Sequence, residues 1–149
     1  MLPAFAPFGV SITLNPMKFL LIAVCILAAL FAFSQLSRGK IISPAEAAKL
    51  LEGGQAVLID VREPGEWAAT GVAAPAVLLS LSDLQGARKD WKPFLEENQG
   101  RELVLYCRSG NRSGIAARLL AKEGWSTVNA GAFKDWAAAG LPVRQVSAR

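Results

Sequence analysis

The sequence predicts an α/β domain whose central parallel sheet is flanked by helices, preceded by one N-terminal transmembrane helix. Two observations predict the domain: short apolar runs of strand length recur along the chain, and segments with helical patterning lie between them. Strands that alternate with helices typically form a parallel sheet covered on both faces. A third observation predicts the transmembrane helix, because no polar residue occurs from Phe19 to Phe33.

Residues 17–36 form the predicted transmembrane anchor. About twenty residues at ~1.5 Å each span roughly the ~30 Å hydrocarbon core of a bilayer. The alternative is a cleaved secretory signal peptide, although residues 32–34 offer only a poor cleavage site. Residues 1–16 have no assigned role, and residues 37–40 form a short linker to a domain at residues 41–149. Basic residues after the apolar run favour a single-pass membrane protein with this domain on the cytoplasmic side.

Composition excludes several classes of function. The net charge of +4 comes largely from basic residues that flank the apolar run, and no basic run with interleaved aromatics occurs. Nucleic-acid binding is therefore not expected. The chain has no histidine, which excludes Ser-His-Asp and Cys-His catalysis. Cys25 lies in the apolar run and Cys107 in a distant polar segment, so we expect no disulfide, no metal site and no cofactor.

The elements of the domain follow from local patterns, taken in chain order. Ser43, Pro44 and Glu46 form a capping box that begins a helix, which continues to about Glu52 and ends at two glycines. Short apolar runs predict strands, and patterns with helical periodicity predict helices. The expected strands are 56–59, 77–79, 103–106 and a weak one at 126–128, and the expected helices are 90–97, 113–123 and 132–139.

The segment from Cys107 to Ser113 contains the predicted site. A buried strand ends at Cys107 and a helix starts at Ser113, and between them lie Arg108, Ser109, Gly110, Asn111 and Arg112. A tight loop that turns its N–H groups inward at a helix N-terminus favours an anion. A thiolate in this position, beside arginines, has a lowered pKa and needs no histidine to act as a nucleophile. The alternative, a cysteine buried as a small hydrophobe, does not explain two arginines so near to it.

The loop at residues 107–113, Cys-Arg-Ser-Gly-Asn-Arg-Ser, resembles the active-site loop of the rhodanese-like sulfurtransferase family. Three further motifs agree with that family in order: the pattern Asp-Val-Arg-x-x-x-Glu-Trp at residues 60–67, the segment 124–136, and Gly-Leu-Pro-Val at residues 140–143. The similarity covers roughly residues 41–143. One departure is that a histidine common in the family after the acidic motif is absent from residues 70–76.

The resemblance implies one rhodanese-like domain that transfers sulfane sulfur. Cys107 would attack a small donor such as thiosulfate, hold the sulfur as a persulfide and pass it to a thiophilic acceptor, which is a thiol or a protein. The backbone N–H groups of residues 108–112 would stabilise the charge on sulfur, Arg112 would brace the loop, and Arg108 would meet the anionic donor.

The charged cluster of Asp60, Arg62 and Glu66 has two interpretations. It could act as an acid–base group, or it could support the Cys107 loop through ion pairs. We favour the supporting role, because a single charged cluster in a turn usually belongs to the scaffold.

Two other functions remain open. Phosphatases and arsenate reductases of the Cdc25 type also place a cysteine before an anion-binding loop and an arginine. Their loops are one residue longer than the segment 108–111 that separates Cys107 from Arg112, and the shorter spacing favours sulfur transfer. A membrane-tethered module that only carries sulfur or binds a partner would also retain the cysteine.

Overall fold

The computed structural model describes residues 17, 20–27 and 41–147. The chain divides into two compact units, Met1–Leu36 and Ser37–Arg149. The labelled helices and strands, α2 to α7 and β1 to β6, all lie in the second unit. The unassigned segment 1–16 and the predicted linker 37–40 lie outside the described residues.

The predicted membrane location is wrong on the present structure. Within the predicted anchor 17–36, the structure describes residue 17 and a helix at residues 20–27, while 18–19 and 28–36 lie outside the described part. At ~1.5 Å per residue, the described residues 20–27 span about 12 Å, whereas a bilayer core is about 30 Å thick. No helix among the described residues has both the length and the apolar character needed to cross a membrane. This finding overturns the prediction of a single-pass protein with its domain on the cytoplasmic side.

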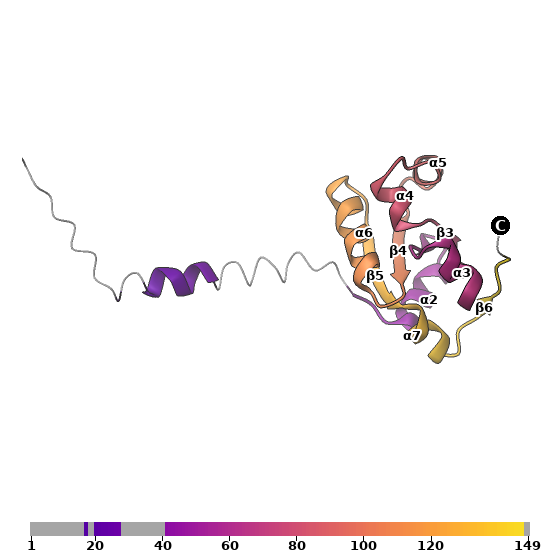
Figure 1. Cartoon of the computed structure of the whole chain (residues 1–149), viewed down its shortest axis with the longest axis horizontal. Coiled ribbons are helices and arrows are strands. Elements are labelled where there is room, and N and C mark those ends of the chain that lie inside the picture. Colours follow the sequence, from indigo (N-terminus) through magenta and orange to yellow (C-terminus); the bar gives the residue numbers. More distant parts are fainter. Residues whose placement is uncertain (1–16, 18–19, 28–40, 148–149) are drawn as a thin grey trace, which may run out of the picture. The chain divides into compact units, whose positions relative to one another are not determined.

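A four-stranded parallel sheet forms the centre of the second unit (Figure 1). Its strands lie in the order β3-β1-β4-β5, so β4 is flanked on both sides by other strands. Because all three pairings are parallel, the carboxyl ends of the strands meet at one edge of the sheet. The strands are β1 (Ala56–Asp60), β3 (Val77–Leu78), β4 (Glu102–Cys107) and β5 (Thr127–Ala132).

Helices cover both faces of this sheet, as the sequence predicts. Val57 and Ile59 pack into one hydrophobic cluster with α4, α5 and α6, whereas Leu58 belongs to a second cluster with α2 and α7. This division follows from the alternation of side chains along a strand. The helices are α2 (Pro44–Glu52), α3 (Pro64–Thr70), α4 (Leu81–Gln85), α5 (Trp91–Glu97), α6 (Asn111–Lys122) and α7 (Phe133–Ala138). A small antiparallel pair, β2 (Val72–Ala73) and β6 (Val143–Arg144), completes the fold.

Local signals account for some elements better than for others. The capping box at the start of α2 is present, with the Ser43 backbone N–H donating to Glu46 at 2.8 Å. The structure adds α3, which the sequence pattern did not predict and which begins with Pro64 at its first position. Strand β5 is longer than the weak strand expected at residues 126–128, because pairing with β4 extends it through poor strand formers such as Gly131.

Candidate active site

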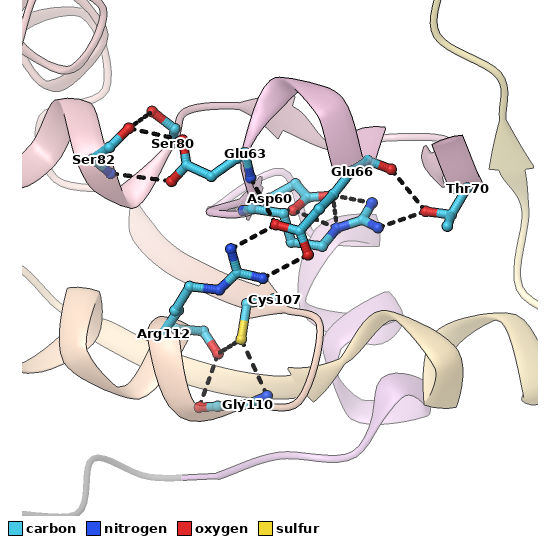
Figure 2. Close-up of polar contacts among 11 residues, drawn as sticks. Asp60, Glu63, Glu66, Thr70, Ser80, Ser82, Cys107, Gly110 and Arg112 are labelled. Atoms are coloured by element: carbon cyan, nitrogen blue, oxygen red, sulfur yellow. Dashed lines mark hydrogen bonds and ion pairs between the residues drawn. The ribbon is translucent and has the colours of Figure 1, made fainter. Parts of the chain in front are cut away.

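Cys107 is the last residue of β4 and lies at the carboxyl edge of the sheet. The chain then turns through the loop 107–113, and α6 begins at Asn111. Gly110 adopts a φ of +88°, a left-handed conformation in which most other residues are strained. In this conformation the Gly110 backbone N–H donates a hydrogen bond to the Cys107 Sγ at 3.1 Å. Figure 2 shows the sulfur directed toward Gly110.

The loop stabilises a negative charge on the sulfur. Burial raises the pKa of the Cys107 thiol, but hydrogen bonds from the Ser113 hydroxyl and from the backbone of Ser113, Ser109 and Gly110 lower it by more. The pKa of Cys107 therefore lies below its ordinary value. The Ser113 hydroxyl lies 3.5 Å from Sγ. A lowered pKa increases the fraction of thiolate, which is the nucleophilic form, at neutral pH.

An ion pair joins the loop to α3. The Arg112 guanidinium donates two hydrogen bonds to the Glu66 carboxylate, at 2.6 and 2.7 Å (Figure 2). Both side chains are 29% exposed. The Arg112 hydrogen bond is the largest of the effects that lower the pKa of Glu66 to about 2. The pKa of Arg112 is raised first by its hydrogen bond to Glu66 and also by the charge of Cys107.

A second, buried ion pair lies where the chain leaves β1. Asp60 and Arg62 are 0% and 2% exposed, and their side chains approach to 2.6 Å. The Arg62 guanidinium also donates to the Thr70 hydroxyl and the Gly71 carbonyl, each at 2.7 Å, so it ties the end of α3 to β1. It also lies 4.3 Å from the centre of the Phe133 ring.

Asn129 is the residue of this site that sequence reasoning missed. It is 6% exposed on β5, and its side-chain amide donates to the Gly110 carbonyl at 2.9 Å. Its Oδ1 atom accepts from the Ser113 hydroxyl at 2.8 Å. Asn129 thereby supports two of the residues, Gly110 and Ser113, that hydrogen-bond to the Cys107 sulfur. The signal that could have revealed it is an amide side chain inside a strand next to the one that ends at the cysteine.

The structure brings most of the predicted site residues together, with two differences in detail. Among the described residues, the groups that contact Sγ come from Ser109, Gly110 and Ser113. Arg108 and Asn111 instead have exposed side chains. Asp60, Arg62 and Glu66 form ion pairs around the loop, as the supporting interpretation expects. In the described part of the chain, no group of three or more acidic or cysteine side chains could hold a metal ion.

The thiol is closed off from solvent in this conformation. Cys107 is 0% exposed. A pocket of about 570 Å³ adjoins the loop and is lined by Arg108, Ser109 and Glu66 among others, but not by Cys107. In this conformation the pocket therefore does not open onto the sulfur. Glu66 of the Arg112–Glu66 ion pair lines this pocket, so the ion pair lies beside it.

Comparison with known proteins agrees with this geometry. Residues 43–139 match the family model of the rhodanese-like domain. The chain therefore belongs to the rhodanese-like domain family. It is 34% identical over 103 residues to an uncharacterized protein of Synechocystis sp., across 68% of this chain and 54% of that protein. It is 29% identical over 92 residues to thiosulfate:glutathione sulfurtransferase of Saccharomyces cerevisiae, across 56% of this chain and 66% of that protein. The chain thus spans between about half and two thirds of these curated relatives.

A solved structure shows a similar fold. The polysulfide-sulfur transferase homodimer from Wolinella succinogenes matches with a TM-score of 0.58 and 27% identity. The match covers 80% of this chain and 90% of that one. The domain architecture is therefore that of rhodanese-like proteins, with a central parallel sheet between two helical layers.

Proposed function

We propose that this protein is a sulfurtransferase of the rhodanese type, with residues 41–149 as its catalytic domain and Cys107 as its nucleophile. One observation carries the proposal: the Cys107 sulfur lies at the end of a central strand with a lowered pKa and with a backbone N–H of its own loop directed at it. The names of two relatives, a thiosulfate:glutathione sulfurtransferase and a polysulfide-sulfur transferase, support the same class of reaction.

The proposed reaction has two steps. The Cys107 thiolate attacks the outer sulfur of thiosulfate, the S–S bond of the donor breaks, and sulfite leaves with the electron pair. Cys107 then carries a persulfide, whose charge the loop N–H groups stabilise. An acceptor such as cyanide or a thiolate attacks the terminal sulfur, the Cys–S–S bond breaks, and the Cys107 thiolate is restored. No oxidant or reductant is needed.

Each site residue has a distinct proposed role. Ser109, Gly110 and Ser113 stabilise the charged sulfur, and Asn111 completes the turn into α6. Arg112 braces the loop through Glu66, the buried pair of Asp60 and Arg62 supports α3, and Arg108 meets the anionic donor. These assignments are consistent with the exposed position of Arg108 and the paired positions of the other charged residues.

Activity of the full chain tests the proposal. The protein should convert thiosulfate and cyanide to sulfite and thiocyanate, and Cys107→Ser should abolish turnover. After thiosulfate treatment, mass spectrometry should find one added sulfur, about 32 Da, on the peptide that contains Cys107. An unmodified Cys107, or normal turnover by the serine variant, would show that the mechanism is wrong.

A sulfur carrier without turnover of its own is the second candidate, because Cys107 is fully covered in the structure. A carrier would gain the sulfur from thiosulfate but would not release it to cyanide or small thiols. The second step therefore distinguishes the two functions. It is measured by adding cyanide or a small thiol to the preformed persulfide: an enzyme releases the sulfur to it, and a carrier does not.

A further inference from the structure

The pocket beside the Cys107 loop contains a positively charged side chain, Lys134, that the proposed sulfur transfer does not use. The loop contributes Arg108 and Ser109 to it, α7 contributes Phe133 and Lys134, and α3 forms another part of the wall. Lys134 lies in the segment 124–136 that resembles the family, but the sequence pattern assigned it no role in the site. It nevertheless lines the same pocket as Arg108, the residue that follows the nucleophile.

Two of the charged side chains in the pocket are already neutralised within the protein. Arg62 is paired with Asp60 at 2.6 Å, and Glu66 is paired with Arg112 at 2.6 Å. Arg108 and Lys134 are exposed, and within the part of the chain that the structure describes no ion pair engages either of them. The pocket therefore has two uncompensated positive charges, which favour an occupant with two negative charges.

The volume and wall of the pocket indicate what else the occupant contains. At about 570 Å³, the pocket falls within the range of roughly 300–1,000 Å³ that is typical of sites for organic ligands. Thiosulfate, a single small ion, would leave most of this space empty. Phe133 and Ala69 supply apolar surface between the charged groups. A carbon skeleton with carboxylates matches this combination of volume, apolar wall and cationic rim.

We propose that Lys134, together with Arg108 after the donor has left, binds the carboxylates of the sulfur acceptor, which is a small organic thiol with at least two carboxylate groups. Lys134 is then a specificity-determining residue. The assignment rests on the proposed sulfur transfer. In the step it serves, the acceptor thiolate attacks the terminal sulfur of the Cys107 persulfide. The bond between the two sulfurs breaks, its electron pair returns to Cys107, and the acceptor leaves as a persulfide.

The test compares charged and neutral acceptors with the full-length chain. Glutathione, which has two carboxylates, and 2-mercaptoethanol, which has none, are each varied with thiosulfate as the donor. Lys134→Glu should lower kcat/KM for glutathione by roughly 5–20-fold, because an attractive charge becomes repulsive, and should change the value for 2-mercaptoethanol by less than about twofold. The effect on glutathione should shrink in high salt, since the pocket is open to solvent.

Lys122→Glu is the matched control, because it makes the same charge change in the last turn of α6, outside the pocket. It should leave kcat/KM unchanged for both thiols. Equal losses with glutathione and 2-mercaptoethanol in Lys134→Glu would overturn the proposal. Lys134→Glu is also assayed with thiosulfate varied and cyanide as the acceptor. If kcat/KM falls only in this assay, the site binds the donor, and the proposal is overturned as well.

The persulfide on the wild-type protein separates this inference from the proposed function. If thiosulfate adds no sulfur to Cys107, sulfur transfer itself fails. If the persulfide forms and both thiols discharge it equally well in the wild type and in Lys134→Glu, only the acceptor site fails. Lys134 is exposed, so the variant should fold, and its thermal unfolding is measured alongside to establish this.

Discussion

Replacing Glu66 with glutamine should loosen the Cys107 loop, because it removes the charge that holds Arg112. The pKa of Glu66 is lowered from 4.5 to about 2 in the folded protein, a difference that corresponds to roughly 3 kcal/mol. Both partners are 29% exposed, and water screens such pairs. We therefore expect Glu66→Gln to lower the free energy of unfolding at pH 7 by about 1–2 kcal/mol.

The effect should depend on pH in a defined direction. The folded-state pKa of Glu66 lies below its unfolded value, so folding favours the charged form. Its stabilisation is complete above about pH 4.5 and is lost as the pH falls toward 2. The difference between wild type and Glu66→Gln should therefore be constant from pH 7 to 5 and should shrink below that range. Urea denaturation at a series of pH values measures this difference.

Two further measurements connect this stability to access to the thiol. Cys107 is fully covered, so a weaker Arg112–Glu66 pair should let iodoacetamide alkylate it faster, as read by mass on its peptide. Glu123→Gln is the control, because it breaks the similar Arg88–Glu123 pair, which is 2.7 Å long and at the surface. It should leave the alkylation rate unchanged. A stability difference that persists undiminished at pH 3, or equal alkylation rates in Glu66→Gln and wild type, would refute the reasoning.

Three other substitutions test the supports of the site. Ser113→Ala should raise the pKa of Cys107, since it removes a hydrogen bond that lowers it, and the pH profile of alkylation should move to higher pH. Asp60→Ala should cost about 3–5 kcal/mol in urea denaturation, because it leaves the buried Arg62 without a counter-charge. Gly110→Ala should cost about 1–2 kcal/mol in the same assay, because φ is +88° there, and it should also slow sulfur uptake from thiosulfate.

Each of these expectations has a contrary result. An unchanged alkylation profile in Ser113→Ala would mean that the hydroxyl does not stabilise the thiolate. A loss below about 1 kcal/mol in Asp60→Ala would show that the buried pair does not support the fold. Wild-type stability and sulfur uptake in Gly110→Ala would show that the left-handed turn is not needed to direct its N–H at the sulfur.

The sequence by itself determined the features that depend on neighbouring residues. Alternating apolar runs and helical patterns predicted the parallel sheet between helices, and the capping box predicted the start of α2. The end of a strand, a glycine-containing turn and a helix start within seven residues predicted a tight turn after Cys107, which the structure contains. These features could be predicted because the interactions that produce them join residues only a few positions apart.

Only the tertiary structure decided which distant residues meet the loop. Glu66 and Arg112 are 46 positions apart, and Ser113 and Asn129 are 16 apart, yet both pairs are in direct contact. Hydropathy alone predicted a membrane span, but among the described residues no helix is long and apolar enough to cross a membrane. Lys134 lies in the pocket because β5 and α7 return the chain to the carboxyl edge of the sheet. Such contacts depend on the packing of the whole domain, which no local pattern records.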